Sequence, residues 1–315
     1  MSPQALGILS AVGAALTFSV NDTAIKFLSG GYALHQLVFI RSVISMLFLL
    51  GLILPLAGGW HLLRTRRPGL NLVRGALIFT SNMLFFLALS MMSLAEAVAV
   101  FFVAPLLITV FSVVFLGEQV GPRRWAAVAI GFVGVVVILR PGTSAFQLVA
   151  LLPLLAAACY AAMHTLTRRV GRIDRAETMA VYAQGFFLTG SLAFGLLFGD
   201  GRFASAPPPF DFLLRPWIWP PTGDWLVLGA AGLASGIGGY LITQAYRLCE
   251  GGLAAPFEYV NMPAAILWGL FVFGEWPDAV AWVGIALISL GGLYMAWREM
   301  QVLRRAGPAG VEGRL

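Results

Sequence analysis

Apolar residues in this chain fall into ten blocks of about 20 residues. A helix of that length spans the roughly 30 Å hydrocarbon core of a bilayer, whereas membrane-spanning strands alternate polar and apolar residues over about ten positions. The chain contains no such alternating segments. The sequence therefore predicts an all-α integral membrane protein surrounded by the lipid bilayer. The predicted segments cover residues 5–28, 33–55, 70–92, 95–116, 122–139, 147–167, 178–198, 225–246, 253–274 and 279–297.

The composition agrees with a membrane location. Hydrophobic residues make up 59% and charged residues 11% of the chain, against about 25% charged residues in soluble domains. The net charge of +6 comes from short basic clusters between the apolar blocks, which are topology signals and do not indicate nucleic-acid binding. The two cysteines, Cys159 and Cys249, have no metal-ligand neighbour in the sequence, so no metal site is expected.

The basic residues are distributed unequally between the two sides of the membrane. The side with the termini carries 15 Lys and Arg residues, and the other side carries three: Arg140, Arg202 and Arg215. Cytoplasmic loops are the ones enriched in Lys and Arg. The sequence therefore predicts a multi-pass protein of the bacterial-type inner (plasma) membrane with both termini in the cytoplasm.

The chain repeats itself at an offset of 157 residues. Gly117 and Trp125 of the first half correspond to Gly274 and Trp282 of the second, and Glu118 corresponds to Glu275. Each half has five segments, so the second half enters the membrane from the opposite side. Inverted repeats of this kind are typical of secondary transporters. The predicted units are a first five-helix repeat (1–144), a second, inverted repeat (145–299) and a cytoplasmic tail (300–315).

These motifs resemble the EamA-type transporters of the drug/metabolite transporter superfamily. The likeness is carried by SVNDTAIKF in the first segment, FIRSVIS in the second and the two Gly-Glu segments. It implies ten transmembrane helices and alternating-access transport of a small organic metabolite, of the amino-acid, S-adenosylmethionine or riboflavin class. It implies no cofactor and leaves the oligomeric state open. The long segment 200–224 departs from the compact family pattern.

Charged residues inside the segments are candidate site residues, because each costs at least about 2.5–3.5 kcal/mol at mid-membrane depth. Arg41 either faces a cavity and attracts an anionic substrate group, or pairs with Asp22 and only locks the first two helices. Glu258 is either a substrate contact and proton acceptor, or a buried acid held by neighbouring helices. Asp22 and Glu96 are further candidates for ion coupling, but Glu96 could instead complement the dipole of its helix.

Uncharged polar residues within the segments are candidates for substrate binding. They are Asn82, His164, Gln244, Tyr259 and Asn261. The alternative for each is an interhelical hydrogen bond, which is the commoner role of such residues.

Prolines interrupt the fourth and ninth segments at nearly matching places. Pro105 and Pro263 are therefore predicted hinges, because paired interruptions in corresponding helices mark transporter sites.

The rival functions are a membrane scaffold or receptor, and a membrane-embedded enzyme without a recognisable catalytic motif. The sequence contains no HExxH, GxSxG or Walker motif and no acidic metal cluster. The predicted function is therefore transport of a small-molecule substrate, and not catalysis.

Overall fold

A computed structural model describes residues 3–311, except for 66, 118–119, 142–147, 171–173, 205–206, 249–253 and 255–256. Within these residues the chain is helical and contains no strand, as predicted. The main elements are α1 (Pro3–Leu28), α2 (Leu34–Phe48), α3 (Leu54–Ala57), α4 (Pro68–Leu89), α5 (Leu94–Phe101), α6 (Ala104–Leu116), α7 (Pro122–Leu139), α8 (Leu151–Val170), α9 (Ala176–Phe198), α10 (Phe210–Leu214), α11 (Asp224–Leu248), α13 (Asn261–Phe273) and α14 (Ala279–Val311). Short π- and 3₁₀-helical pieces are η1 (Leu49–Ile53), η2 (Trp60–Leu63) and η3 (Leu148–Ala150).

The described helices match the predicted segments closely except for the ninth, where α13 begins at Asn261, eight residues after the predicted start at 253. Eight spans are long and apolar enough to cross a membrane, and Asn261–Phe273 and Ala279–Met295 form shorter apolar helices among the described residues. The predicted fourth segment consists of α5 and α6, separated by a turn at Phe102–Val103. The last helix, α14, continues to Val311, so it includes most of the predicted tail. Glu118, Cys249 and the predicted repeat boundary lie outside the described residues.

The helix ends follow from the residues that occupy them. Pro68 and Pro122 begin α4 and α7, where the missing backbone N–H of proline costs nothing. Gly117 and Gly274 end α6 and α13 with φ of 70° and 66°. This left-handed conformation is accessible to glycine without steric penalty. The two glycines that mark the sequence repeat therefore end their helices in the same way.

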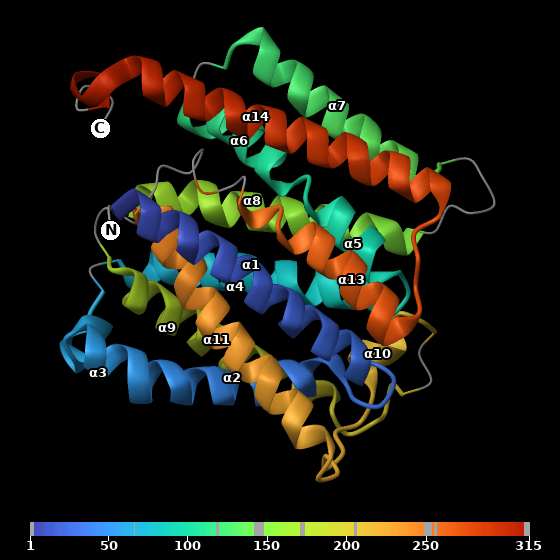
Figure 1. Cartoon of the computed structure of the whole chain (residues 1–315). Coiled ribbons are helices and arrows are strands. Elements are labelled where there is room, and N and C mark those ends of the chain that lie inside the picture. Colours follow the sequence, from blue (N-terminus) through green and yellow to red (C-terminus); the bar gives the residue numbers. More distant parts are fainter. Residues whose placement is uncertain are drawn as a thin grey trace.

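Helices of the two halves pack in matching pairs. Helix α1 of the first half packs against α11 of the second half, and α4 of the first half packs against α8 of the second half. The pair α7 and α14 lies side by side at one edge of the bundle (Figure 1). A Cβ atom on Gly134 would lie 2.9 Å from the Gly284 carbonyl oxygen. A Cβ atom on Gly291 would lie 2.9 Å from the Ala127 carbonyl oxygen. These two contacts are related by the 157-residue offset.

The interrupted helices of the two halves touch each other at their turns. The turn at Phe102–Val103 has its counterpart, 157 residues later, at Tyr259–Val260 before α13. The Tyr259 hydroxyl donates a hydrogen bond to the Phe102 carbonyl over 3.1 Å, and the two rings lie 4.9 Å apart. The predicted hinge residues Pro105 and Pro263 follow these turns, in the first residues of α6 and α13.

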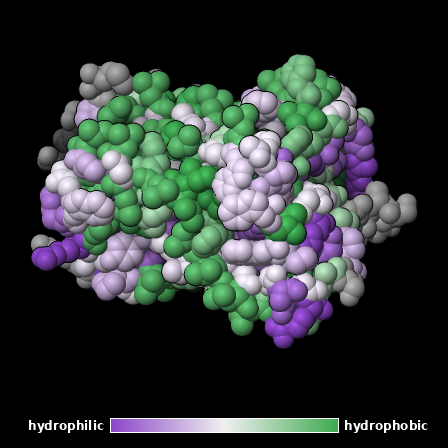
Figure 2. Space-filling view, turned by 90° about the horizontal axis from the view of Figure 1, so that it is seen from below, coloured by the Kyte–Doolittle hydropathy of each residue, from purple (hydrophilic) through white to green (hydrophobic). Residues whose placement is uncertain are grey.

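The two ends of the bundle differ in structure. Both termini lie at the same end in Figure 1, and α10 with its flanking chain lies at the other. There the Trp217 indole donates to His35 Nδ1 over 2.5 Å, and the Ile218 N–H donates to Gln36 Oε1 over 3.2 Å. In Figure 2 hydrophobic residues fill the middle of the surface, and hydrophilic residues gather towards both ends. Such a hydrophobic belt is expected for a protein whose helices cross the bilayer.

Candidate functional site

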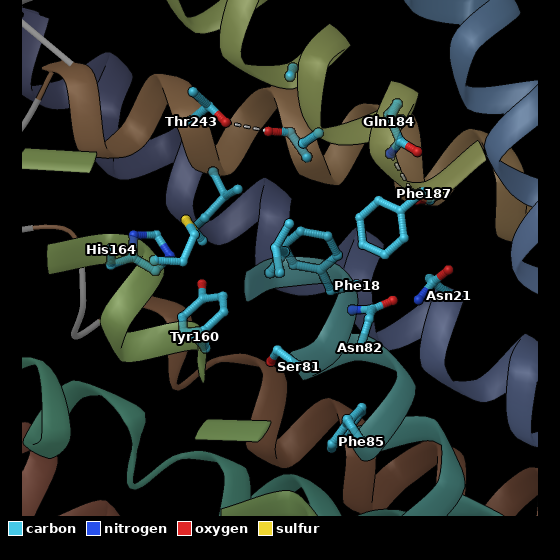
Figure 3. Close-up of a pocket in the computed structure, with 18 of the residues that line it drawn as sticks. Phe18, Asn21, Ser81, Asn82, Phe85, Tyr160, His164, Gln184, Phe187 and Thr243 are labelled. Atoms are coloured by element: carbon cyan, nitrogen blue, oxygen red, sulfur yellow. Dashed lines mark hydrogen bonds between the residues drawn. The ribbon is translucent and has the colours of Figure 1, made fainter. Parts of the chain in front are cut away.

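A cavity of about 160 Å³ lies inside the bundle. One buried water needs roughly 10–15 Å³ on the same measure, so the cavity has room for a small organic molecule. Its polar lining comes from six helices, from Glu258 just before the turn at Tyr259–Val260 and from the first residue of α13. Figure 3 shows part of it. The polar lining residues are Asn21, Asp22, Arg41, Asn71, Arg74, Ser81, Asn82, Tyr160, His164, Gln184, Ser235, Thr243, Glu258 and Asn261.

Arg41 of α2 is the cation at the centre of this lining, and only 2% of its surface is exposed. Its Nη1 donates to Asn21 Oδ1 over 2.9 Å, and its Nη2 donates to Asn82 Oδ1. The guanidinium lies between the rings of Phe86 and Phe187, with its carbon 5.0 and 5.2 Å from their centroids. Charge-assisted hydrogen bonds and two cation–π contacts together stabilise a charge that the membrane would otherwise exclude.

Asp22 of α1 lies beside this centre but is linked to Arg41 through another side chain. Asn21 donates from Nδ2 to Asp22 Oδ1 over 3.0 Å and accepts from Arg41 on its own Oδ1. The Asn261 side chain at the start of α13 also lies near Asp22. Among the described residues, no direct ion pair joins Asp22 to Arg41. The two charges therefore tie α1, α2 and α13 together around the cavity, while Arg41 still lines it.

Polar atoms on cavity-lining residues of α2, α9 and α13 are buried without a hydrogen-bond partner in the described part of the chain. They are one donor, Arg41 Nε, and two acceptors, Gln184 Oε1 and Asn261 Oδ1. Gln184 uses its amide nitrogen to donate to Ser235 over 3.2 Å, which leaves its oxygen available. Buried polar groups in folded proteins are almost always paired. One donor and two acceptors are therefore available to a molecule in this cavity.

Glu258 forms a second polar centre, just before the turn at Tyr259–Val260. Its carboxyl group accepts from the Tyr160 hydroxyl over 3.1 Å and from the Tyr246 hydroxyl. The His164 ring lies between the two tyrosines, with ring centroids 4.3 and 4.5 Å away. Glu258 takes part in no ion pair of the described residues. In Figure 3, Tyr160 and His164 lie apart from Asn21, Asn82 and Phe187, with Phe18 between the two groups.

Arg74 is a cavity-lining residue that was counted only among the 15 Lys and Arg residues on the side of the termini, although it falls within the predicted segment 70–92. It lies six residues after the start of α4, about 9 Å along the helix, and is 7% exposed. Pro68 was the available signal, because a helix that begins there places Arg74 in its second turn. Asn21 and Asn71 were also missed as lining residues, since neither carries a charge that makes its membrane location unusual.

The structure brings together six of the predicted site residues and separates the others from the cavity. The residues that line it are Asp22, Arg41, Asn82, His164, Glu258 and Asn261. Tyr259 instead bonds Phe102, and Gln244 donates to the Tyr240 hydroxyl over 3.0 Å. Glu96 accepts from the Ser93 hydroxyl over 2.9 Å at the start of α5, which is the helix-end role given as its alternative.

Metal binding has no support in the described part of the chain. No three His, Cys, Asp or Glu side chains there come close enough together to hold a metal ion. The arrangement of the cavity is that of a binding site for an organic molecule with hydrogen-bonding groups and an aromatic or apolar body.

Known proteins are similar to this chain in sequence. Residues 5–140 match the EamA-like transporter family. A riboflavin transporter of Rhizobium johnstonii is 32% identical over 248 residues, covering 78% of this chain and 76% of that protein. A riboflavin transporter of Vibrio cholerae is 28% identical over 305 residues, 95% of each chain. An S-adenosylmethionine uptake transporter of Rickettsia prowazekii is 24% identical over 284 residues, 90% of each.

A solved crystal structure is also similar. It superposes with a TM-score of 0.65 at 25% identity, over 93% of this chain and 97% of that one.

Proposed function

Since this chain belongs to the EamA-like transporter family of the drug/metabolite transporter superfamily, we propose that it carries riboflavin across the membrane through the cavity around Arg41. Family membership makes it a multi-pass inner-membrane transporter of a small metabolite and not an enzyme. Riboflavin is the first candidate because the relatives named as riboflavin transporters include one that is 32% identical.

The observation that carries the proposal is the set of unpaired polar atoms in the cavity. A flavin ring presents carbonyl acceptors and an imide N–H donor along one edge. The Arg41 Nε donor can bind one of these carbonyls, and one of the acceptors, Gln184 Oε1 or Asn261 Oδ1, can bind the imide N–H. Aromatic side chains that line the same cavity, Phe85 and Phe187 among them, supply surfaces for the flat ring.

The test is uptake of riboflavin into proteoliposomes containing wild-type protein and an Arg41→Gln variant. One hydrogen bond to a charged group is worth about 1.5–3 kcal/mol, so we expect the variant to lose at least about tenfold in uptake at low substrate concentration. Arg202→Gln, which removes a positive charge from an exposed loop, is the matched control and should keep full uptake. If neither the wild type nor the control takes up riboflavin, this substrate is excluded.

A second candidate substrate is a zwitterionic amino-acid derivative such as S-adenosylmethionine. The supporting observation is the Glu258 carboxyl group, which lies beside the rings of Tyr160, His164 and Tyr246. A carboxylate with aromatic neighbours attracts an organic cation, while Arg41 would take the substrate carboxylate. Uptake of S-adenosylmethionine or another amino acid, without uptake of riboflavin in the same vesicles, would favour this candidate.

Glu258 is also the group to which we assign proton coupling, with Asp22 as the alternative. Both are cavity-lining acids without a direct ion-pair partner among the described residues. A pH gradient imposed across the vesicles should drive uptake by wild type but not by Glu258→Gln. If the gradient has no effect on wild type, the assignment fails while the transport proposal stands.

The proposed mechanism is alternating access by two inverted five-helix repeats, 1–144 and 145–299. It is supported by the matching helix pairs and by the 157-residue relation between the turns at Phe102 and Tyr259. The proposed topology places both termini and His61 in the cytoplasm and Phe210 outside. Single cysteines at 61 and 210, in a background without the two native cysteines, should react with an impermeant thiol reagent from opposite sides. Reaction from the same side would overturn the topology.

A further inference from the structure

The cavity contains a second guanidinium group, that of Arg74, whose hydrogen-bonding capacity is only partly used. Its Nε donates to Thr167 Oγ1 over 2.8 Å and its Nη1 to Asn71 Oδ1 over 3.1 Å. Among the described residues, the acceptor for Nη2 is the Met163 sulfur at 3.9 Å. A guanidinium has five N–H donors, and thioether sulfur is a weak acceptor. Part of the Arg74 fork is therefore available to a molecule in the cavity that it lines.

Arg74 and the Arg41 centre lie at two levels of the same cavity wall. Asn82, which accepts from Arg41, follows Arg74 by eight residues on α4, so the two levels are about 12 Å apart along the helix. The lining residues of α4 between them are Gly75, Ile78 and Ser81. Their spacing of three or four residues forms one stripe along the helix. The cavity is therefore elongated along α4, with a guanidinium at each level.

The chemistry of the two levels differs. Phe187 lies against the Arg41 guanidinium, and Phe85 follows Asn82 by one helical turn on the cavity lining, so aromatic surface gathers at the Arg41 level. At the Arg74 level the neighbouring polar side chains include Thr167 and Asn71. Asn71 is 1% exposed and donates to Asp174 Oδ2 over 2.7 Å. The unused N–H groups of Arg74 are donors for hydroxyl or other oxygen acceptors at that level.

We infer that Arg74 forms a second substrate subsite, about one ligand length from Arg41, which binds the hydroxyl-bearing chain of an elongated flavin while the ring lies at Arg41. The inference rests on the proposed transport of riboflavin and adds to it a determinant of selectivity. Arg74 discriminates flavins by their side chain, because a ligand that ends at the ring does not reach it. A purely structural Arg74, which only joins α4 to Thr167 of α8, predicts no such discrimination.

The test compares two ligands that share one ring. Riboflavin carries a ribityl chain, and lumiflavin carries a methyl group in its place. In proteoliposomes, Arg74→Gln should raise the KM for riboflavin by about tenfold, as expected for the loss of one charged hydrogen bond. The inhibition constant of lumiflavin against riboflavin uptake should change by less than about twofold. Arg41→Gln should weaken both ligands, and Arg64→Gln, which removes an exposed charge before α4, should weaken neither.

Each outcome decides between the alternatives. If Arg74→Gln weakens both flavins equally, or weakens neither, the second subsite is refuted and riboflavin transport by the wild type still stands. If the wild type does not transport riboflavin, the proposed function fails and the subsite fails with it. Should Arg74→Gln not fold, Arg74→Lys keeps the positive charge and loses the planar fork. It should still lose affinity for riboflavin selectively, and unchanged selectivity in that variant refutes the inference.

Discussion

Replacing Glu275 by Gln neutralises the partner of Lys26, the only lysine of the chain. Lys26, near the end of α1, lies with its Nζ 2.8 Å from Glu275 Oε1 and donates to the Met92 carbonyl over 2.5 Å. The other carboxylate oxygen of Glu275 accepts from the Leu94 N–H over 3.1 Å. The pair therefore joins α1, the start of α5 and the segment after α13 at the end of the bundle away from the termini.

The expected size of the effect follows from the exposure of the two side chains. Lys26 is 9% exposed and Glu275 is 32% exposed. Exposed ion pairs contribute about 0–1 kcal/mol, and hydrogen bonds to charged groups about 1.5–3 kcal/mol. A pair with one buried and one partly solvated member lies between these ranges. We expect Glu275→Gln to destabilise the protein by about 1–2 kcal/mol, because the ammonium loses its counter-charge and keeps only neutral partners.

The assay is a double-mutant cycle on thermal unfolding of the purified protein in detergent. Glu275→Gln and Lys26→Met should each lower the midpoint by a few degrees. The double variant should lose about 1 kcal/mol less than the sum of the two single changes, because the interaction is removed only once. A double variant whose loss equals that sum would show that the two side chains do not interact, and would refute the assigned contact.

Two further predictions concern packing and pH. Gly291→Val should destabilise the protein by about 1–3 kcal/mol in the same assay, because its Cβ would lie 2.9 Å from the Ala127 carbonyl oxygen of α7. The control is Gly229→Val, because no atom lies within 4 Å of a Cβ at that position. Equal losses of stability in the two variants would contradict the close crossing of α7 and α14. The hydrogen bond from Arg140 holds the pKa of Asp278 below its usual value. The pair therefore stabilises the folded state at pH values above the usual pKa of aspartate. This stabilisation is lost as the pH falls through the lowered pKa. Since the Asp278 side chain is 56% exposed, acidification should cost wild type less than about 1 kcal/mol relative to Asp278→Asn, and identical pH profiles would count against the pair.

Part of the candidate site could be predicted because charge in a membrane is rare. Arg41, Asp22 and Glu258 were identified on that ground, and the structure places all three on one cavity. Arg74 escaped the same reasoning, because its position near the end of a segment made it one more cytoplasmic charge. Gln244 and Tyr259 were proposed as ligand contacts on polarity alone. Polarity does not reveal whether a side chain faces a cavity or a neighbouring helix.

The sequence by itself determined the all-helical membrane class and the positions of the spanning segments. It also determined the ends of α6 and α13 at Gly117 and Gly274. These properties depend on local free energies: the transfer of about 20 apolar residues into lipid and the conformational freedom of single residues.

Only the tertiary structure decided which side chains share the cavity and how Asn21 links Arg41 to Asp22. It also decided that Arg74 lies on the same wall as Asn82. Spanning helices are apolar on most faces, so their sequence carries little information about rotation around the helix axis. That rotation is set by contacts between segments far apart in the chain, such as α4 against α8 and α1 against α11.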